Sequence, residues 1–211
     1  MSSQSKTGRP SLAEAEALTE KILDVASMQF FEKGYAGTSL DAISSAAGIS
    51  KPTLYRRFAD KGVLFAAVLR RRAEDVAVSA SQPGQTPLEQ LRALGAAMLE
   101  TLSRPLAIQF LRVVIAEGPR FPELALLVSD PERSPVFGSA MDLIEQAQQE
   151  GQLGTGQARW LANTFLFLVW GLPAQRTLMG STEYASAKAR QDHLARAWTL
   201  FVTGAEQAAK A

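Results

Sequence analysis

The 211-residue sequence contains no cysteine and a single histidine, His193. Without thiols, disulfides, iron–sulfur clusters, thiolate zinc sites and a cysteine nucleophile are excluded. One histidine also argues against a Ser-His-Asp triad and against a multi-histidine metal site. The sequence therefore predicts no metal, no cofactor and no enzymatic activity.

Long hydrophobic runs are also missing. The most apolar stretch, residues 160–173, is fourteen residues long and contains Asn163, whereas a membrane-spanning helix needs about 20 apolar residues. The first eleven residues are polar and small, which does not fit a secretory signal peptide. These absences predict a cytoplasmic protein with no membrane partner.

The composition is that of a folded globular protein, with 46% apolar and 20% charged residues. The net charge of +1 is unevenly spread. Residues 1–72 contain eleven Lys or Arg and seven Asp or Glu, whereas residues 73–211 contain eleven and fourteen. A basic front part indicates contact with a polyanion, although a bias of this size also arises by chance.

Helical periodicity runs through the chain, and hairpin signals are absent. Ser11 and Glu14 have the spacing of a capping box, and Gly34 is placed to end the first helix. Asp60 is placed to cap a longer helix that runs to about Ser81. The pattern predicts further helices over residues 87–102, 105–117, 120–128, 133–150, 156–179 and 184–208.

Two short helices are expected between residues 38 and 58, separated by a turn at Gly48. Thr38 opens the first, and Ser50 caps the second, where Pro52 is tolerated because a first-turn N–H has no helical partner. Such a pair forms a helix-turn-helix, whose second helix enters the DNA major groove. Its exposed side chains would be Lys51, Thr53, Tyr55, Arg56 and Arg57, whereas Leu54 and Phe58 would face inward. A plain helical hairpin with a solvated basic face is the alternative.

The helix-turn-helix belongs to a longer ordered run: Ile22-Leu23-Asp24-Val25-Ala26, Phe30-Phe31-Glu32-Lys33-Gly34-Tyr35, Thr38-Ser39-Leu40-Asp41-Ala42-Ile43, Ala46-Ala47-Gly48-Ile49-Ser50-Lys51-Pro52-Thr53-Leu54-Tyr55-Arg56-Arg57-Phe58, then Asp60-Lys61 and Leu64. This run of about 45 residues resembles the DNA-binding domain of TetR-family transcriptional regulators. It departs at Gly62, where the family usually has Glu or another polar residue. The resemblance implies a homodimer whose two reading heads bind a near-palindromic operator.

The resemblance also implies which residues meet double-stranded DNA. Lysine and arginine neutralise phosphates, and hydroxyl groups reach phosphates or base edges. Arg9, in a polar N-terminal arm, is placed to reach a minor groove. The implied contacts on the helices are Thr38, Ser50, Lys51, Thr53, Tyr55, Arg56 and Lys61.

Residues 114–124 are similar to the C-terminal domain of the AefR-like subgroup, which often governs efflux or other small-molecule responses. The expected fold is all-α. An N-terminal arm and three-helix bundle with the helix-turn-helix (residues 1–59) bind DNA, and a long helix links them to a helical ligand-binding and dimerisation domain (residues 60–211). The expected function is a regulator, commonly a repressor in this family, that a small apolar effector releases from its operator.

Most aromatic residues in the back half are expected to form the core and the dimer interface, and a few are candidates for a ligand cavity. By the resemblance, the last two long helices of each subunit form the dimer interface, for which the candidates are Trp160, Phe167, Trp170, Trp198 and Phe201. A ligand cavity is mostly apolar with a few polar groups. Its candidate lining residues are Leu102, Gln109, Phe110, Val114, Phe137, Met141, Gln146, Asn163 and Phe165.

Two alternative functions stay open at this point. A helical adaptor that binds only protein would show no DNA affinity that falls steeply with salt. A DNA-binding regulator without a small-molecule ligand is the other alternative, and the long apolar back half argues against it.

Overall fold

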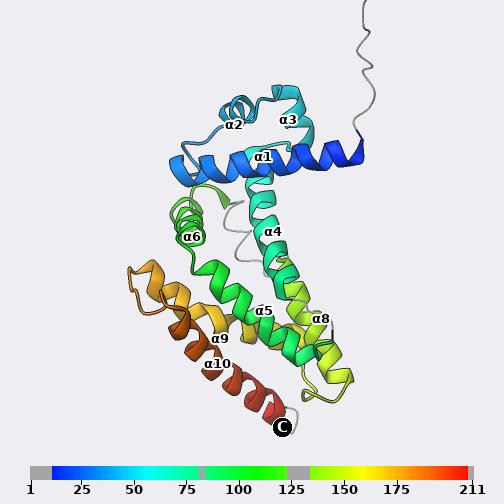
Figure 1. The fold of residues 1–211 in the computed structure, drawn as a ribbon. Helices are drawn as coiled ribbons and strands as arrows, with labels where there is room; N and C mark the ends of the chain where they lie inside the picture. The colour runs from blue at the N-terminus through cyan, green and yellow to red at the C-terminus, as the bar shows by residue number, and fades with distance from the viewer. Residues whose placement is uncertain (1–10, 81–83, 123–133, 209–211) are drawn as a thin grey trace, which may run out of the picture. The chain divides into compact units, whose positions relative to one another are not determined.

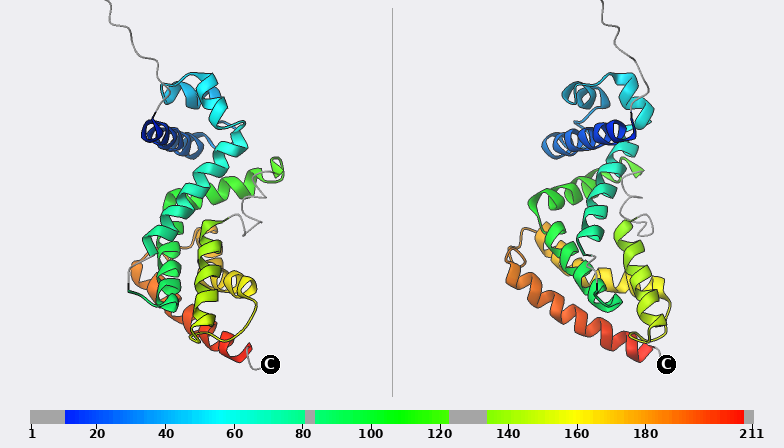
Figure 2. Two further views of the ribbon diagram at one scale, coloured as in Figure 1. Left: turned by 90° about the vertical axis from the view of Figure 1, so that its right-hand side faces the viewer. Right: turned by 45° about the vertical axis from the view of Figure 1, so that its right-hand side comes forward.

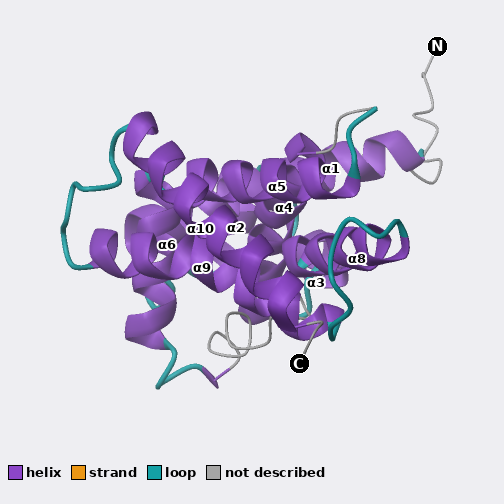
Figure 3. Cartoon of the chain, turned by 90° about the horizontal axis from the view of Figure 1, so that it is seen from below, coloured by secondary structure: helices purple, strands orange, loops and turns teal. Residues whose placement is uncertain are grey.

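The computed structural model describes residues 11–80, 84–122 and 134–208, and in those ranges every regular element is a helix (Figure 3). The predicted all-α fold is confirmed. Residue contacts divide the chain into two compact units, Met1–Val68 and Leu69–Ala211.

The first unit contains α1 (Leu12–Lys33), α2 (Leu40–Ala46), α3 (Lys51–Arg57) and the start of α4 (Lys61–Ala80) (Figure 1). The predicted capping box opens α1. The Ser11 hydroxyl accepts a hydrogen bond from the Glu14 N–H at 3.2 Å, and the Glu14 carboxylate accepts one from the Ser11 N–H at 2.8 Å. The two bonds satisfy N–H groups that have no partner within the helix. The hydrogen bond that the carboxylate accepts from the Ser11 N–H, together with the nearby Ser11 hydroxyl, lowers the pKa of the Glu14 carboxyl.

The second helix begins one residue later than the sequence predicted. Ser39 is its N-cap and accepts a hydrogen bond from the Ala42 N–H at 3.1 Å. Thr38 does not open the helix, because its buried hydroxyl donates to the carbonyls of Gln29 at 3.0 Å and Gly34 at 2.7 Å. Thr38 therefore closes the end of α1 instead of starting α2.

Three aromatic rings form the centre of the first unit. Phe65 meets Phe30 and Tyr35 edge to face, at centroid distances of 4.9 and 5.3 Å, and the latter two stack at 5.8 Å. All three side chains are buried. Because Phe65 lies on α4 and Phe30 on α1, this cluster fixes the first turns of α4 to the rest of the unit.

The second unit contains the rest of α4 with α5 (Pro87–Leu102), α6 (Pro105–Glu117), α8 (Pro135–Gln149), α9 (Ala158–Leu178) and α10 (Ala187–Ala208). Their bounds confirm the predicted helices to within three residues, and most of the predicted helix 120–128 lies outside the described residues. Proline occupies the first position of α5, α6 and α8, where a missing N–H costs nothing.

Helices α5, α8, α9 and α10 pack side by side around one apolar core (Figure 2). Gly95 on α5 permits a close approach, because a Cβ there would lie 2.9 Å from the Phe165 ring and 3.2 Å from Leu194. The predicted cavity residues Phe137 and Phe165 belong to this core and are buried.

A proline inside α9 is matched by the single histidine. Pro173 has no N–H, so the carbonyl of Val169, four residues earlier, loses its helical donor. The Nε2 atom of buried His193, on α10, lies 3.0 Å from that carbonyl and 3.1 Å from the carbonyl of Leu168. Both partners are acceptors, so Nε2 carries the hydrogen and donates. The histidine thus satisfies the backbone group that the proline leaves unpaired.

Candidate nucleic-acid interface

Helix α3 is short because both of its ends are fixed locally. The Ser50 hydroxyl accepts a hydrogen bond from the Thr53 N–H at 3.3 Å and lies 2.8 Å from the Thr53 hydroxyl. At the other end Phe58 has an extended backbone, with φ −131° and ψ 105°. Leu54 and Phe58 are buried, as predicted. They anchor one side of α3, so the opposite side projects from the unit.

That projecting side carries the predicted cationic and aromatic groups. Lys51, Tyr55 and Arg56 are exposed, and 47% of the Tyr55 surface is accessible. Thr53 and Arg57, which the sequence placed among the exposed residues, are half-buried. Arg57 donates to the Thr19 hydroxyl at 2.9 Å. Its guanidinium ties α3 to α1, because the arginine lies on the side of α3 that turns toward the unit.

Lys51 has an acidic partner that the sequence analysis did not single out. Its Nζ donates to a carboxylate oxygen of Asp41 at 2.6 Å, and the two side chains are 60% and 52% exposed. The hydrogen bond to Asp41 and the negative charge of that carboxylate raise the pKa of Lys51. A spacing of ten residues across a turn gives no periodic signal, so only the fold brings these groups together.

Two other predicted DNA contacts are engaged inside the unit. The Lys61 Nζ donates to the carbonyls of Tyr35 at 2.7 Å and Thr38 at 3.0 Å, and it lies 4.3 Å from the centre of the Tyr35 ring. The Thr38 side chain is 2% exposed. Both residues hold the loop before α2 against the start of α4, and their contact with DNA stays a prediction. Arg9 lies outside the described residues.

The predicted ligand-cavity residues occupy several different places. Leu102, Phe137, Met141 and Phe165 pack in or against the core of the second unit. On α6, Phe110 and Val114 are buried and Gln109 is half-buried, whereas Asn163 on α9 is exposed.

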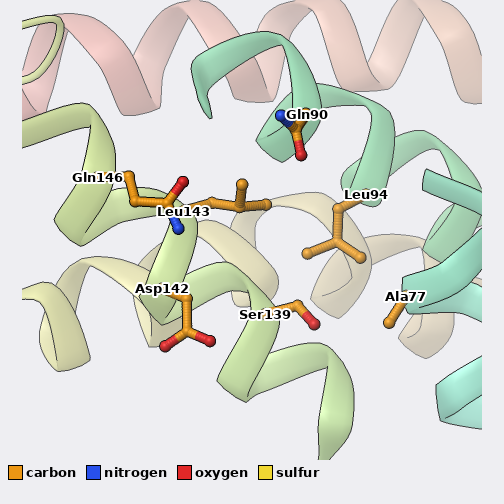
Figure 4. A pocket seen from close by; sticks show the side chains of 7 residues that line it. All are labelled: Ala77, Gln90, Leu94, Ser139, Asp142, Leu143 and Gln146. Carbon is orange, nitrogen blue, oxygen red and sulfur yellow. The ribbon is translucent and has the colours of Figure 1, made fainter. Parts of the chain in front are cut away.

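A pocket of about 190 Å³ lies between α4, α5 and α8, and of the predicted cavity residues Gln146 lines it while the other eight do not. Figure 4 shows Gln90 on α5 facing Leu143 and Gln146 on α8, with Leu94 beside them. The Gln90 amide donates to the carbonyl of Gln85 at 3.0 Å, which leaves its oxygen as an acceptor. The remaining lining residues are Ala77, Ser139 and Asp142.

The predicted dimer residues divide into exposed and buried groups. Trp160 and Phe167 on α9 are 60% and 75% exposed, whereas Phe201 is buried in the core. Trp170 and Trp198 are partly buried against that core. Trp160, Asn163, Phe167 and Gly171 follow helical spacing, so they share one face of α9. The ring of Phe167 lies 3.2 Å from the place that a Cβ of Gly171 would occupy.

The parts of the chain that the structure describes contain neither a membrane-spanning helix nor a cluster of metal-binding side chains. None of the helices there is long and apolar enough to cross a bilayer. The same residues contain no group of three or more His, Cys, Asp or Glu side chains placed to hold a metal ion.

Two family models match the chain. The model of bacterial regulatory proteins of the tetR family matches residues 22–68, which include α2 and α3. The model of the C-terminal domain of AefR-like transcriptional repressors matches residues 89–204, more than half of the chain.

Individual relatives agree with these models. The HTH-type transcriptional regulator YvkB of Bacillus subtilis is 23% identical over 185 residues, or 88% of this chain and 95% of its own. The HTH-type transcriptional activator FasR of Mycolicibacterium smegmatis is 35% identical over 78 residues, which are 37% of this chain and only 36% of its own. Among solved structures, the flavonoid-responsive regulator FrrA has a TM-score of 0.68 at 28% identity, covering 90% of this chain and 97% of its own.

Proposed function

Because this chain belongs to the TetR family of DNA-binding transcriptional regulators, with an AefR-like C-terminal domain, we propose that it acts as a homodimeric repressor that a small molecule releases from a near-palindromic operator. In this proposal residues 1–59 bind DNA, and residues 60–211 bind the effector and the second subunit. The family and the relatives are regulators and not enzymes. A regulator of chromosomal genes works in the cytoplasm, where we place it.

The exposed side of α3 is the observation that carries the proposal. Buried Leu54 and Phe58 fix the helix, so that Lys51, Tyr55 and Arg56 all project from one surface. Arginine and lysine neutralise phosphates or bind guanine edges, and a tyrosine hydroxyl donates to phosphate. In the proposed complex Ser50 and Thr53 add hydroxyl groups at the end of α3 that enters the groove. Arg9, Thr38 and Lys61 are proposed as flanking contacts.

The apolar face of α9 supports a homodimer. Trp160 and Phe167 expose large apolar surfaces, and Leu200 on α10 is 65% exposed. In a twofold dimer the same surface of each subunit meets its copy, so a single apolar face covers both partners. Two reading heads then meet two major grooves about 34 Å apart on one side of the duplex.

The pocket between α4, α5 and α8 supports effector binding and changes the expected ligand. Four of its seven lining residues are polar, and Asp142 forms no ion pair with any residue that the structure describes. We therefore propose a small ligand with hydrogen-bond donors and a short apolar part, in place of a purely apolar one. Ala77 on α4 lines the pocket, and α4 also contributes Phe65 to the core of the first unit. Ligand contacts that favour one position of α4 would shift the dimer between two states, and couplings of this kind are typically about 1–3 kcal/mol.

Repression is the direction that we propose, since the family model covering the C-terminal half describes repressors. FasR is named as an activator, and its alignment covers only 37% of this chain. FrrA is named as responsive to a flavonoid, which supports a small-molecule effector for this chain without specifying it.

The proposal is tested by selecting duplexes from a random library with the wild-type protein and then titrating the enriched duplex. We expect the Lys51→Ala, Tyr55→Ala double variant to bind it at least about 100-fold more weakly, because two contacts per subunit are lost. The control Lys33→Ala removes an exposed positive charge from α1 and should retain most of the affinity.

Three outcomes separate the alternatives. Loss of the specific complex in the double variant, with unchanged size and helicity, supports α3 as the reading helix. Equal weakening by Lys33→Ala would mean that charge alone accounts for binding. Failure of the wild-type protein to bind any DNA at low salt would refute the regulator reading and favour a protein adaptor.

A further inference from the structure

The surface proposed to meet DNA contains one acidic group that its function does not require. Asp41 is the second residue of α2, and its carboxylate is about half exposed beside the first residue of α3. A carboxylate near phosphates is repelled by them, so it weakens binding to every DNA sequence alike. Because this acid lowers affinity for all DNA, any benefit that it brings lies in discrimination between DNA sequences.

The ion pair changes what Lys51 can do. With its Nζ 2.6 Å from the Asp41 carboxylate, the two side chains together carry no net charge. A neutral pair releases no counterion when it approaches a phosphate, so Lys51 adds little to sequence-independent affinity. The ammonium group has three N–H donors, and the carboxylate takes one of them. The other two remain for acceptors such as guanine O6 and N7, at a position that the carboxylate holds fixed.

We propose that Asp41 is a positioning residue that sets DNA selectivity, by neutralising Lys51 toward phosphates and holding its ammonium for base edges. The inference rests on the proposed function of α3 in reading DNA. In this role the Asp41–Lys51 pair lowers affinity for non-operator DNA, which is present in large excess over an operator. An alternative role for Asp41 is to stabilise the first turn of α2, where a negative charge is favourable.

The test compares wild-type protein with Asp41→Asn, Lys51→Met and the double variant. Each is titrated at several salt concentrations with the enriched duplex and with a scrambled duplex of the same composition. Asp41→Asn frees one positive charge in each subunit, so the plot of log affinity of the dimer against log salt for the scrambled duplex should steepen by about 1.8. At about 0.15 M salt this corresponds to about 30-fold tighter scrambled-duplex binding. Affinity for the enriched duplex should stay within about twofold, so selectivity falls.

Two controls separate this role from a general effect of charge or of stability. Glu32→Gln removes an exposed carboxylate from α1 of the same unit and should leave the slope unchanged. In the Lys51→Met background, Asp41→Asn relieves only the repulsion between this carboxylate and the phosphates, so it should change the slope clearly less than in the wild-type protein, because no ammonium is freed. Asp41→Ser repeats the measurement with a residue that is favoured near helix N-termini, and thermal melting confirms that each variant is folded.

The inference is overturned if Asp41→Asn leaves the slope and the selectivity of a folded protein unchanged, or if Glu32→Gln has the same effect. It is also overturned if the effect of Asp41→Asn is equally large without Lys51. A wild-type protein that does not prefer the enriched duplex would instead refute the proposed function, so the two failures are distinguishable.

Discussion

The two units of this chain hold their candidate functional side chains in different ways. In the first unit, α3 is only seven residues long, and a cap at Ser50 and two buried anchors determine which way each side chain points. In the second unit, the pocket is lined by residues from α4, α5 and α8 that are up to about 70 positions apart in the sequence. A local site is therefore readable from local rules, whereas a site between packed helices depends on the whole core.

The largest expected effect tests whether the first unit depends on its small aromatic centre. Phe65→Ala removes the ring that meets both Phe30 and Tyr35, and deleting a buried phenylalanine costs about 3–5 kcal/mol. We expect a separate early transition in thermal melting and loss of DNA binding, while the second unit keeps its helicity. Phe165→Ala in the second unit is the matched change and should lower the later transition instead. A single shared transition in both variants would contradict the division into two units.

The next effect tests the exposed face of α9. Phe167→Glu places a charge in the proposed dimer interface, and a central aromatic contact in such an interface is typically worth at least about 2 kcal/mol. We expect the dimer to dissociate at concentrations where the wild-type protein is paired, as measured by sedimentation. Leu12→Glu changes an equally exposed leucine at the start of α1 and should leave the dimer intact. Unchanged dimerisation of Phe167→Glu would exclude this face.

The smallest expected effect on stability tests whether His193 compensates for the N–H that Pro173 lacks. His193→Phe leaves the Val169 carbonyl buried without a donor, at a cost of about 1–3 kcal/mol. Adding Pro173→Ala supplies a backbone N–H to the same carbonyl, so the double variant should recover part of the stability. Chemical denaturation of the two single variants and the double variant measures this coupling. Simple additivity would show that the histidine acts only through packing.

Sequence reasoning succeeded where one residue determines the behaviour of its neighbours. The capping box at Ser11, the burial of Leu54 and Phe58, and the limits of the long helices all follow from short-range chemistry. Short-range chemistry could not decide which residue caps α2, because Thr38 and Ser39 both have suitable hydroxyl groups. The hydrogen bond from Thr38 to Gln29 on α1 leaves Ser39 as the cap.

The second unit shows why the pocket was harder to predict. A phenylalanine in a core and one beside a ligand have the same hydrophobic pattern, so the sequence could not decide that Phe137 and Phe165 are the ones that belong to the core. Residues Gln90 and Asp142, which do line the pocket, look like ordinary solvated residues on a helix surface. The Asp41–Lys51 pair was missed for a related reason, since no spacing rule joins the two helices across the turn.

The match between Pro173 and His193 also constrains the order in which substitutions can accumulate in this chain. A histidine at position 193 is compatible with an intact helix, because a carbonyl oxygen has two lone pairs and can accept from a helical N–H and from the imidazole together. A proline at position 173 without the histidine leaves that carbonyl unpaired at once. The easier mutational path therefore acquires the histidine first, and afterwards the histidine cannot be lost without penalty while the proline remains. The hydrogen bond from His193 to the Val169 carbonyl thus makes two positions, twenty residues apart in the sequence, depend on each other.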